Sequence, residues 1–245
     1  PRAVLHAGAS RVSAAPGATI AERWHQVSAR VRAAAAQAGR EPAAVTLVAV
    51  SKTHPMSAIV AAVAAGARDF GENYVQELVD KQQEPAPAAD VRWHYIGRLQ
   101  RNKARFVAGK VALIHAVDSL ELAVELSRRA AAVQPVLVAV NLAGEATKAG
   151  VSPLDAARVC AEIARLPNLR LDGLMTMPPP VEDPEQVRPV FRALAELRRR
   201  LQDELAQPLP SLSMGMSGDF EVAISEGATH VRVGTAIFGE RPRPG

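Results

Sequence analysis

Short apolar runs rich in β-branched residues recur along the chain and alternate with longer segments whose apolar residues repeat with a helical period. The short runs predict eight strands, at Val45–Val50, Ala67–Phe70, Val91–Ile96, Leu113–Ala116, Val136–Asn141, Leu169–Met175, Ser211–Met214 and His230–Val233. The longer segments predict helices at Ile20–Ala38, Met56–Ala65, Ser119–Ala132, from Ser152-Pro153 onward, and at Pro184–Leu205. Ser119 and Ser152 are suited to cap their helices, and Pro153 suits a first helical position.

Strands joined by helix-length connections pair in parallel, and continuous apolar runs indicate that both faces of each strand are buried. Eight such units in roughly 225 residues predict an α/β fold, a single (β/α)8 TIM barrel with an extra N-terminal helix. A doubly wound open sheet is less favoured, because it would carry a glycine-rich turn where this chain has Ser51-Lys52-Thr53. Residues 1–18 are predicted to be a flexible arm, and residues 19–245 a single barrel domain.

Composition narrows the class of protein. The chain has 245 residues, of which 48% are hydrophobic and 22% charged, and its net charge is +4. The apolar stretch Ala58–Ala67 is far shorter than the roughly 18 residues that span a bilayer. Pro1–Pro16 lacks the apolar core of a secretory signal, and the single cysteine, Cys160, forms no intramolecular disulfide. We therefore expect a cytoplasmic protein without a membrane partner.

Nucleic acid is not an expected partner, although the net charge is positive. Much of the excess lies in Arg198–Arg200, within a segment rich in both signs that is typical of a solvated helix face. Aromatic residues make up only 4% of the chain, too few to form a stacking platform. No cluster with metal-ligand spacing is apparent either.

The ends of the last two strands carry a pattern that suits a phosphate. A TIM barrel places its chemistry at the C-terminal ends of its strands, and the loops after strands seven and eight commonly bind phosphate. Here these loops contain Ser217-Gly218 and Gly234-Thr235, which provide two hydroxyls and two glycines. Glycine allows backbone N–H groups to approach an anion closely. Ordinary turn chemistry would explain either pair alone, whereas both together favour a phosphate site.

Lys52 closes the first apolar strand, so its stem starts inside the barrel mouth. A partly desolvated amine has a lowered pKa and reacts more readily with a carbonyl, although a lysine at a strand end can also extend into solvent. A lysine opposite a phosphate site fits an aldehyde phosphate held as an imine. Pyridoxal 5′-phosphate (PLP) and the sugar phosphate of a Schiff-base aldolase both satisfy this description.

Arg232 favours PLP. It shares a strand face with Gly234, while Val231 and Val233 take the other face, so the arginine is predicted to point into the barrel beside the phosphate loop. A guanidinium there can donate to a pyridine nitrogen and keep that nitrogen unprotonated, because it does not give up its own proton. A buried arginine paired with a carboxylate is the alternative interpretation.

Several long stretches resemble one family, the pyridoxal phosphate homeostasis proteins, and the similarity runs from about Ile20 to Arg241. The matching stretches are Val48–Thr53, Phe70–Glu77, His94–Lys103, Gly173–Met175, Leu212–Asp219 and Val231–Gly239. The resemblance implies the alanine racemase N-terminal type of barrel, and PLP bound as an aldimine to Lys52. It further implies that Asn73 and Met216 contact the cofactor, that Arg232 faces the pyridine nitrogen, and that Ser217, Gly218, Gly234 and Thr235 hold the phosphate.

The resemblance also implies a role in PLP homeostasis and supply without evident catalysis, with PLP-dependent apo-enzymes as possible partners and a monomer or weak dimer as the assembly. Racemisation needs an acid/base group on each face of the imine, and in related racemases one comes from a second domain or subunit. We expect no such domain after the eighth strand, and the only tyrosines are Tyr74 and Tyr95. A slow PLP-dependent amino-acid racemase and a sugar-phosphate aldolase remain the alternatives.

Overall fold

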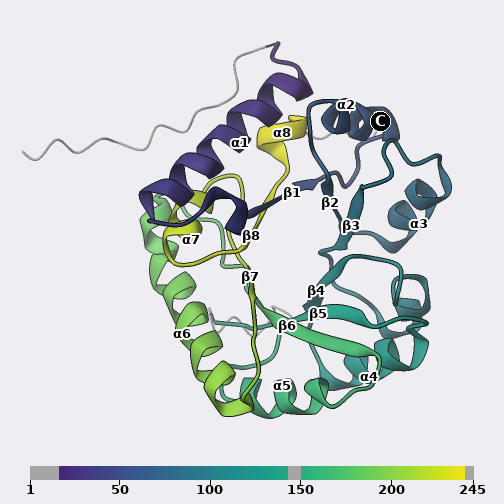
Figure 1. Cartoon of the computed structure of the whole chain (residues 1–245), viewed down its shortest axis with the longest axis vertical. Helices are drawn as coiled ribbons and strands as arrows, with labels where there is room; N and C mark the ends of the chain where they lie inside the picture. Colours follow the sequence, from purple (N-terminus) through teal and green to yellow (C-terminus); the bar gives the residue numbers. More distant parts are fainter. Residues whose placement is uncertain (1–16, 143–149, 241–245) are drawn as a thin grey trace, which may run out of the picture.

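The computed structural model, which describes residues 17–142 and 150–240, is a closed barrel of eight parallel strands ringed by helices (Figure 1). The strands are β1 (Thr46–Val50), β2 (Asp69–Glu72), β3 (Arg92–Tyr95), β4 (Leu113–Val117), β5 (Gln134–Ala139), β6 (Leu169–Met175), β7 (Ser211–Ser213) and β8 (His230–Val233). Each strand pairs with the next, and β8 returns to β1 with His230 opposite Thr46. The predicted TIM barrel and its eight strands are confirmed.

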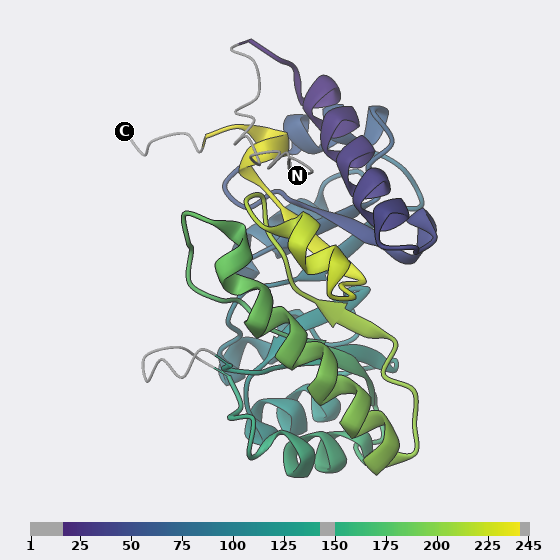
Figure 2. The same cartoon turned by 90° about the vertical axis from the view of Figure 1, so that its left-hand side faces the viewer.

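The helices pack on the outside of the barrel. They are α1 (Ile20–Gln37), α2 (Met56–Ala64), α3 (Val75–Gln83), α4 (Leu120–Arg129), α5 (Ala156–Ala164), α6 (Arg188–Leu205), α7 (Phe220–Ser225) and α8 (Thr235–Phe238). The predicted extra N-terminal helix is α1, which lies beside α7 on one flank of the molecule, with α6 on the other side of α7 (Figure 2). Arg23 of α1 donates to the carbonyl of Ile237 at 3.0 Å, and Arg30 pairs with Glu221.

Three connections differ from the sequence-based expectations. Ser119 caps α4 as predicted, accepting from the N–H of Leu122, but Ser152 accepts from the N–H of Asp155 in a turn, and α5 begins only at Ala156. The segment predicted as one helix from Pro184 is split into the 3-10 turn η3 (Pro184–Val187) and α6. Pro189 lacks the N–H that would bond back to residue 185, which explains the break. The β3–β4 connection, for which no helix was assigned from the sequence, contains the 3-10 helix η2 (Arg101–Phe106), and another 3-10 turn, η1 (Pro42–Ala44), precedes β1.

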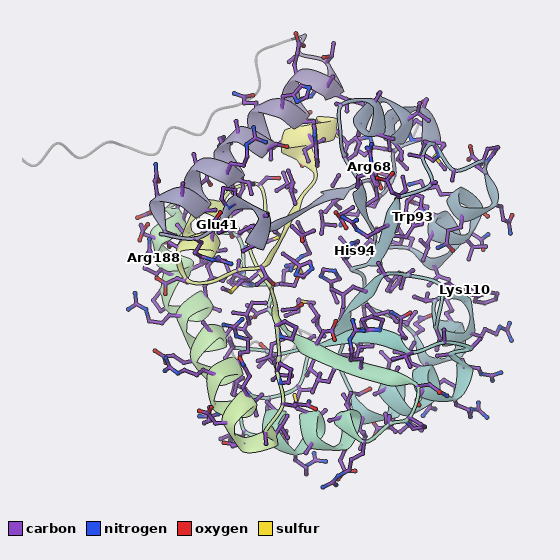
Figure 3. The ribbon with its side chains drawn as sticks, viewed as in Figure 1. Glu41, Arg68, Trp93, His94, Lys110 and Arg188 are labelled. Carbon is purple, nitrogen blue, oxygen red and sulfur yellow. The ribbon has the colours of Figure 1, made fainter. Side chains whose placement is uncertain are left out.

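The barrel interior is divided into an apolar and a polar part. Side chains of β4, β5 and β6 form a small buried cluster of Leu113, Ala116, Leu137, Ala139 and Met175. Buried polar side chains of β3, β4, β7 and β8 lie in the other part; they include His94, His115, Ser213 and Arg232. Figure 3 shows His94 among the side chains at the centre of the barrel. Val231 and Val233 pack in the main core between strands and helices, so β8 alternates as predicted.

The predicted arm lies outside the described residues except for its last two, Gly17 and Ala18. Across the described part of the chain, no helix combines the length and the apolar character needed to cross a membrane. In the same residues, no group of three or more histidine, cysteine or acidic side chains is arranged to hold a metal ion.

Candidate functional site

Lys52 lies on a sharp turn directly after β1. The next residue, Thr53, has φ of 65°, a left-handed conformation that a β-branched residue adopts only when its surroundings enforce it. The N–H of Thr53 donates to Oε2 of Glu77 on α3 at 2.8 Å, which fixes the far side of the turn. The side chain of Lys52 is half-buried, and this residue has at least one polar or electrostatic partner. The turn therefore presents the lysine at the C-terminal end of the barrel in a defined direction.

A buried ion pair holds the near side of this turn. Nζ of Lys81 on α3 donates to Oε1 of Glu72 at 2.7 Å and to the carbonyl of Ser51 at 2.9 Å, and the hydroxyl of Ser51 donates to the same Oε1 at 2.6 Å. The second oxygen of Glu72 is buried without a hydrogen-bond partner. Burial raises the pKa of Glu72, and the charge of Lys81 opposes that rise. Side chains of helix α3 thus bind the residue before Lys52 and the residue after it.

Arg232 is buried inside the barrel and forms no ion pair within the described residues. Its guanidinium donates to the hydroxyl of Ser213 and to the carbonyl of Thr176, the latter at 3.2 Å. Burial lowers the pKa of Arg232 to about 10, and the charge of Asp219 opposes this from a longer distance. Within the described residues, the carboxylate ion pair of the alternative interpretation is therefore not formed, and Asp219 acts on Arg232 only through its charge. A guanidinium has five N–H donors, so donors remain for a ligand.

The loops after β7 and β8 expose unpaired backbone donors. Within the described residues, the N–H groups of Ser217, Gly218, Gly234 and Thr235 donate to no other group. Gly218 has open space where a Cβ would be, and a Cβ on Gly234 would lie 3.4 Å from Val50 at the end of β1. Unpaired N–H groups in loops that contain glycine suit a phosphate, as the predicted cradle requires.

Met216 has no backbone group left for a ligand. Its N–H donates to Oδ1 of Asp219 at 2.6 Å, and its carbonyl accepts from the N–H groups of Asp219 and Phe220. Only its half-buried side chain is left to contact a cofactor.

Asn73 follows β2, the next strand around the barrel. Its carbonyl accepts from the hydroxyl of Tyr95 at 3.3 Å, and the loop after β3 approaches so closely that a Cβ on Gly97 would lie 2.1 Å from the Asn73 oxygen. A cavity of about 900 Å³ opens beside Asn73, between the loops after β2, β3 and β4. Burial raises the pKa of Tyr95 to about 12, so this phenol is a poor acid/base group.

The closed strand order brings the predicted residues to one end of the barrel. Ser217 and Gly218 follow β7. Arg232 lies in β8, Gly234 follows it, and Lys52 follows β1, so three adjacent strands carry most of the set. Sequence reasoning missed Ser213 and Lys81, the residues that support Arg232 and the Lys52 turn. The only signal for Ser213 was a serine next to the last residue of the predicted strand Ser211–Met214.

Comparison with known proteins agrees with this fold. The family model for the alanine racemase N-terminal domain matches residues 24–242. The chain is 48% identical over 223 residues to the pyridoxal phosphate homeostasis protein of Aquifex aeolicus, covering 90% of this chain and 97% of the relative. It is 49% identical over 226 residues to the protein of the same name from Pseudomonas aeruginosa, covering 91% and 96%.

Solved structures show the same barrel. PipY of Synechococcus elongatus, solved with PLP bound, has a TM-score of 0.80 and 37% identity, covering 90% of this chain and all of PipY. An alanine racemase from Corynebacterium glutamicum has a TM-score of 0.65 at 19% identity, covering 91% of this chain and 63% of the racemase. The second likeness establishes the fold alone.

Proposed function

Because the chain belongs to the family of pyridoxal phosphate homeostasis proteins, we propose that it binds PLP covalently through Lys52 and carries it within the cell without turning over amino acids. The lysine amine condenses with the aldehyde of PLP to form a C=N bond, and the aldehyde oxygen leaves as water. Bound PLP supplies an aldehyde and an aromatic electron sink. The proposal draws on the PLP-bound PipY structure, which shares this fold along its whole length.

The observation that carries the proposal is that a buried guanidinium and unpaired backbone N–H donors occur together at one end of the barrel. Arg232 has no carboxylate partner among the described residues, and four N–H groups in the adjacent loops have no acceptor. These donors match an aromatic nitrogen acceptor and a phosphate dianion, the two polar ends of PLP. Lys52, on the neighbouring strand end, would meet the aldehyde, which PLP carries opposite its ring nitrogen and next to its phosphate arm.

The same geometry favours holding over turnover. Arg232 remains a cation at neutral pH and does not pass its proton to the ring nitrogen, so the ring withdraws electrons weakly. The hydroxyl of Tyr95 donates to the carbonyls of Asn73 and Arg98, each at 3.3 Å, and its raised pKa removes it as a base. Lys52 is only half-buried, so an incoming amine or water can reach it.

The test is to load the full chain with PLP, reduce it with borohydride and map the cofactor mass by peptide mass spectrometry. We expect the mass on the peptide that contains Lys52, with visible absorption before reduction. Lys52→Ala should abolish both signals. Lys103→Ala, an exposed lysine at the same end of the barrel, is the matched control and should keep them. A tag on another lysine, or none with excess PLP, contradicts the proposal.

A further inference from the structure

A row of hydrogen-bonded polar side chains crosses the barrel interior and ends on Arg232. From the N-terminal end of the barrel, Oδ1 of Asp69 lies 2.9 Å from Nε2 of His94, and Nδ1 of His94 lies 3.0 Å from Nε2 of His115. Nδ1 of His115 lies 2.7 Å from Oγ of Ser213, which accepts from Arg232. These five residues, on β2, β3, β4, β7 and β8, are named the interior chain.

The available donors and acceptors favour one direction for the hydrogen bonds of the interior chain. Arg92 and His94 hold the pKa of Asp69 at about 2 against the effect of burial, so Asp69 is a carboxylate that only accepts. Nε2 of His94 therefore carries a proton. If His94 is neutral, its Nδ1 accepts from Nε2–H of His115, and Nδ1 of His115 accepts the proton of Ser213. Each of these donors on His94, His115 and Ser213 then has an acceptor.

The opposite arrangement leaves a buried donor without a partner. A doubly protonated His94 would donate to Nε2 of His115, whose Nδ1–H would donate to Ser213. Ser213 would then receive two donors, one of them from Arg232, and its own buried hydroxyl proton would have no acceptor among its described contacts. Burial, together with the charges of His94, His230 and Arg232, lowers the pKa of His115 well below its usual value, which also favours the neutral form.

The favoured direction matters for Arg232, which is buried and has no carboxylate at ion-pair distance among the described residues. Each group of the interior chain turns its acceptor side toward the guanidinium and its donor side away. Aligned in this way, the dipoles stabilise a buried cation and polarise one another. Among the five residues of the interior chain, Asp69 alone carries a net negative charge, and it lies at the end farthest from Arg232.

We propose that Asp69, His94 and His115 are positioning residues that act through Ser213 to hold Arg232 against the ring nitrogen of the bound cofactor. This inference rests on the proposed function and gives a positioning role to residues that lie away from the proposed cofactor site. The far end of the interior chain borders a cavity of about 260 Å³ lined by Thr46, Asp69, Arg92 and His230, at the N-terminal ends of the strands. The ring nitrogen is thus controlled from the end of the barrel opposite to Lys52.

The experiment uses the full chain loaded with PLP labelled with ¹⁵N in the ring, and follows the ¹⁵N chemical shift from pH 6 to pH 8.5. In the wild-type protein we expect an unprotonated nitrogen with a shift that does not move across this range. Ser213→Ala and His115→Phe release Arg232, so the nitrogen should acquire a proton as the pH falls, and PLP affinity should drop about tenfold. Ser213→Thr, which keeps the hydroxyl, should behave as the wild-type protein.

A purely structural role would affect stability and leave the ring nitrogen unchanged. Val159→Ala, in the buried face of α5 away from the barrel interior, is the control that lowers stability alone. Unchanged ¹⁵N titrations in folded Ser213→Ala and His115→Phe would overturn the inference, as would a Ser213→Thr protein that behaves like Ser213→Ala. The borohydride adduct at Lys52 is measured in parallel, because its absence from the wild-type protein would reject the proposed function itself.

Discussion

The ammonium of Lys81 donates to the carbonyl of Ser51 at 2.9 Å, so a buried cation on α3 holds the residue immediately before Lys52. The same ammonium pairs with Glu72, which is fully buried. This arrangement ties the orientation of the proposed PLP lysine to an ion pair that lies outside the barrel interior.

Removing one partner of this pair should be strongly destabilising. Lys81→Met leaves Glu72 buried and unpaired, and we expect a loss of about 3–5 kcal/mol in the free energy of unfolding. The double variant Glu72→Gln/Lys81→Met removes both charges and should recover most of that loss, as measured by urea denaturation. If the losses in the free energy of unfolding from the two substitutions simply add in the double variant, Glu72 and Lys81 are not directly coupled.

The interior histidines should make the protein sensitive to acid. Burial is the first cause that lowers the pKa of His230 to about 4, and the charges of His94 and Arg232 act in the same direction. The unfolded chain then binds more protons than the folded one between pH 6.5 and pH 4. Stability should fall as the pH decreases through this window, by about 3 kcal/mol from His230. The free energy of unfolding is measured by urea denaturation at several pH values. It should depend less steeply on pH in His230→Asn, whereas His25→Asn, at an exposed histidine, should follow the wild-type protein.

The hydroxyls near the proposed phosphate cradle should contribute to PLP affinity. The double variant Ser217→Ala/Thr235→Ala removes two donors to a charged group, and we expect affinity to fall about tenfold for each bond lost. Absorbance titration with PLP measures the change. Arg199→Ala/Arg200→Ala, on the exposed face of α6, is the control and should retain full affinity. Equal losses in the two double variants would place the phosphate elsewhere.

The loaded protein should donate PLP without exchanging the α-proton of an amino acid. Incubation with the apo form of a PLP-dependent transaminase should restore transaminase activity. L-alanine incubated with the loaded protein in deuterated water should gain no deuterium at its α-carbon, because the ring is a poor electron sink. Exchange at the rates typical of enzymes, roughly 1–1,000 per second, would make the protein a racemase.

Arg232→Glu should increase side reactions at the α-carbon, because a carboxylate at this position favours a protonated ring nitrogen. Deuterium incorporation into L-alanine is the measurement, and the borohydride adduct at Lys52 confirms that the variant still holds PLP. A loaded Arg232→Glu protein without any increase would show that the charge at this position does not limit the chemistry.

The barrel could be predicted from the sequence because each strand is a continuous apolar run and each crossover has a helical period. The direction of Arg232 followed from the two-residue alternation of β8. The interior chain could not be predicted in this way, because its members come from five strands and meet only through the register of the closed sheet. His94 and His115 stand in apolar runs, where single polar residues give no indication of a partner 21 positions away. The start of α5 was wrong because a serine that accepts from the third N–H after it fits a turn as well as a helix cap.

The seam between β1 and β8 has a consequence for synthesis of the protein. Thr46 pairs with His230, so the strand that leads to Lys52 is joined to the strand that carries Arg232 by one of the longest-range contacts in the described fold. So long a loop closes late in folding, because the entropic cost of bringing its two ends together comes before the gain from the contact. A nascent chain from which Lys52 has emerged therefore lacks the other half of the proposed site until β8 has left the ribosome. Loading with PLP then marks chains whose barrel has closed.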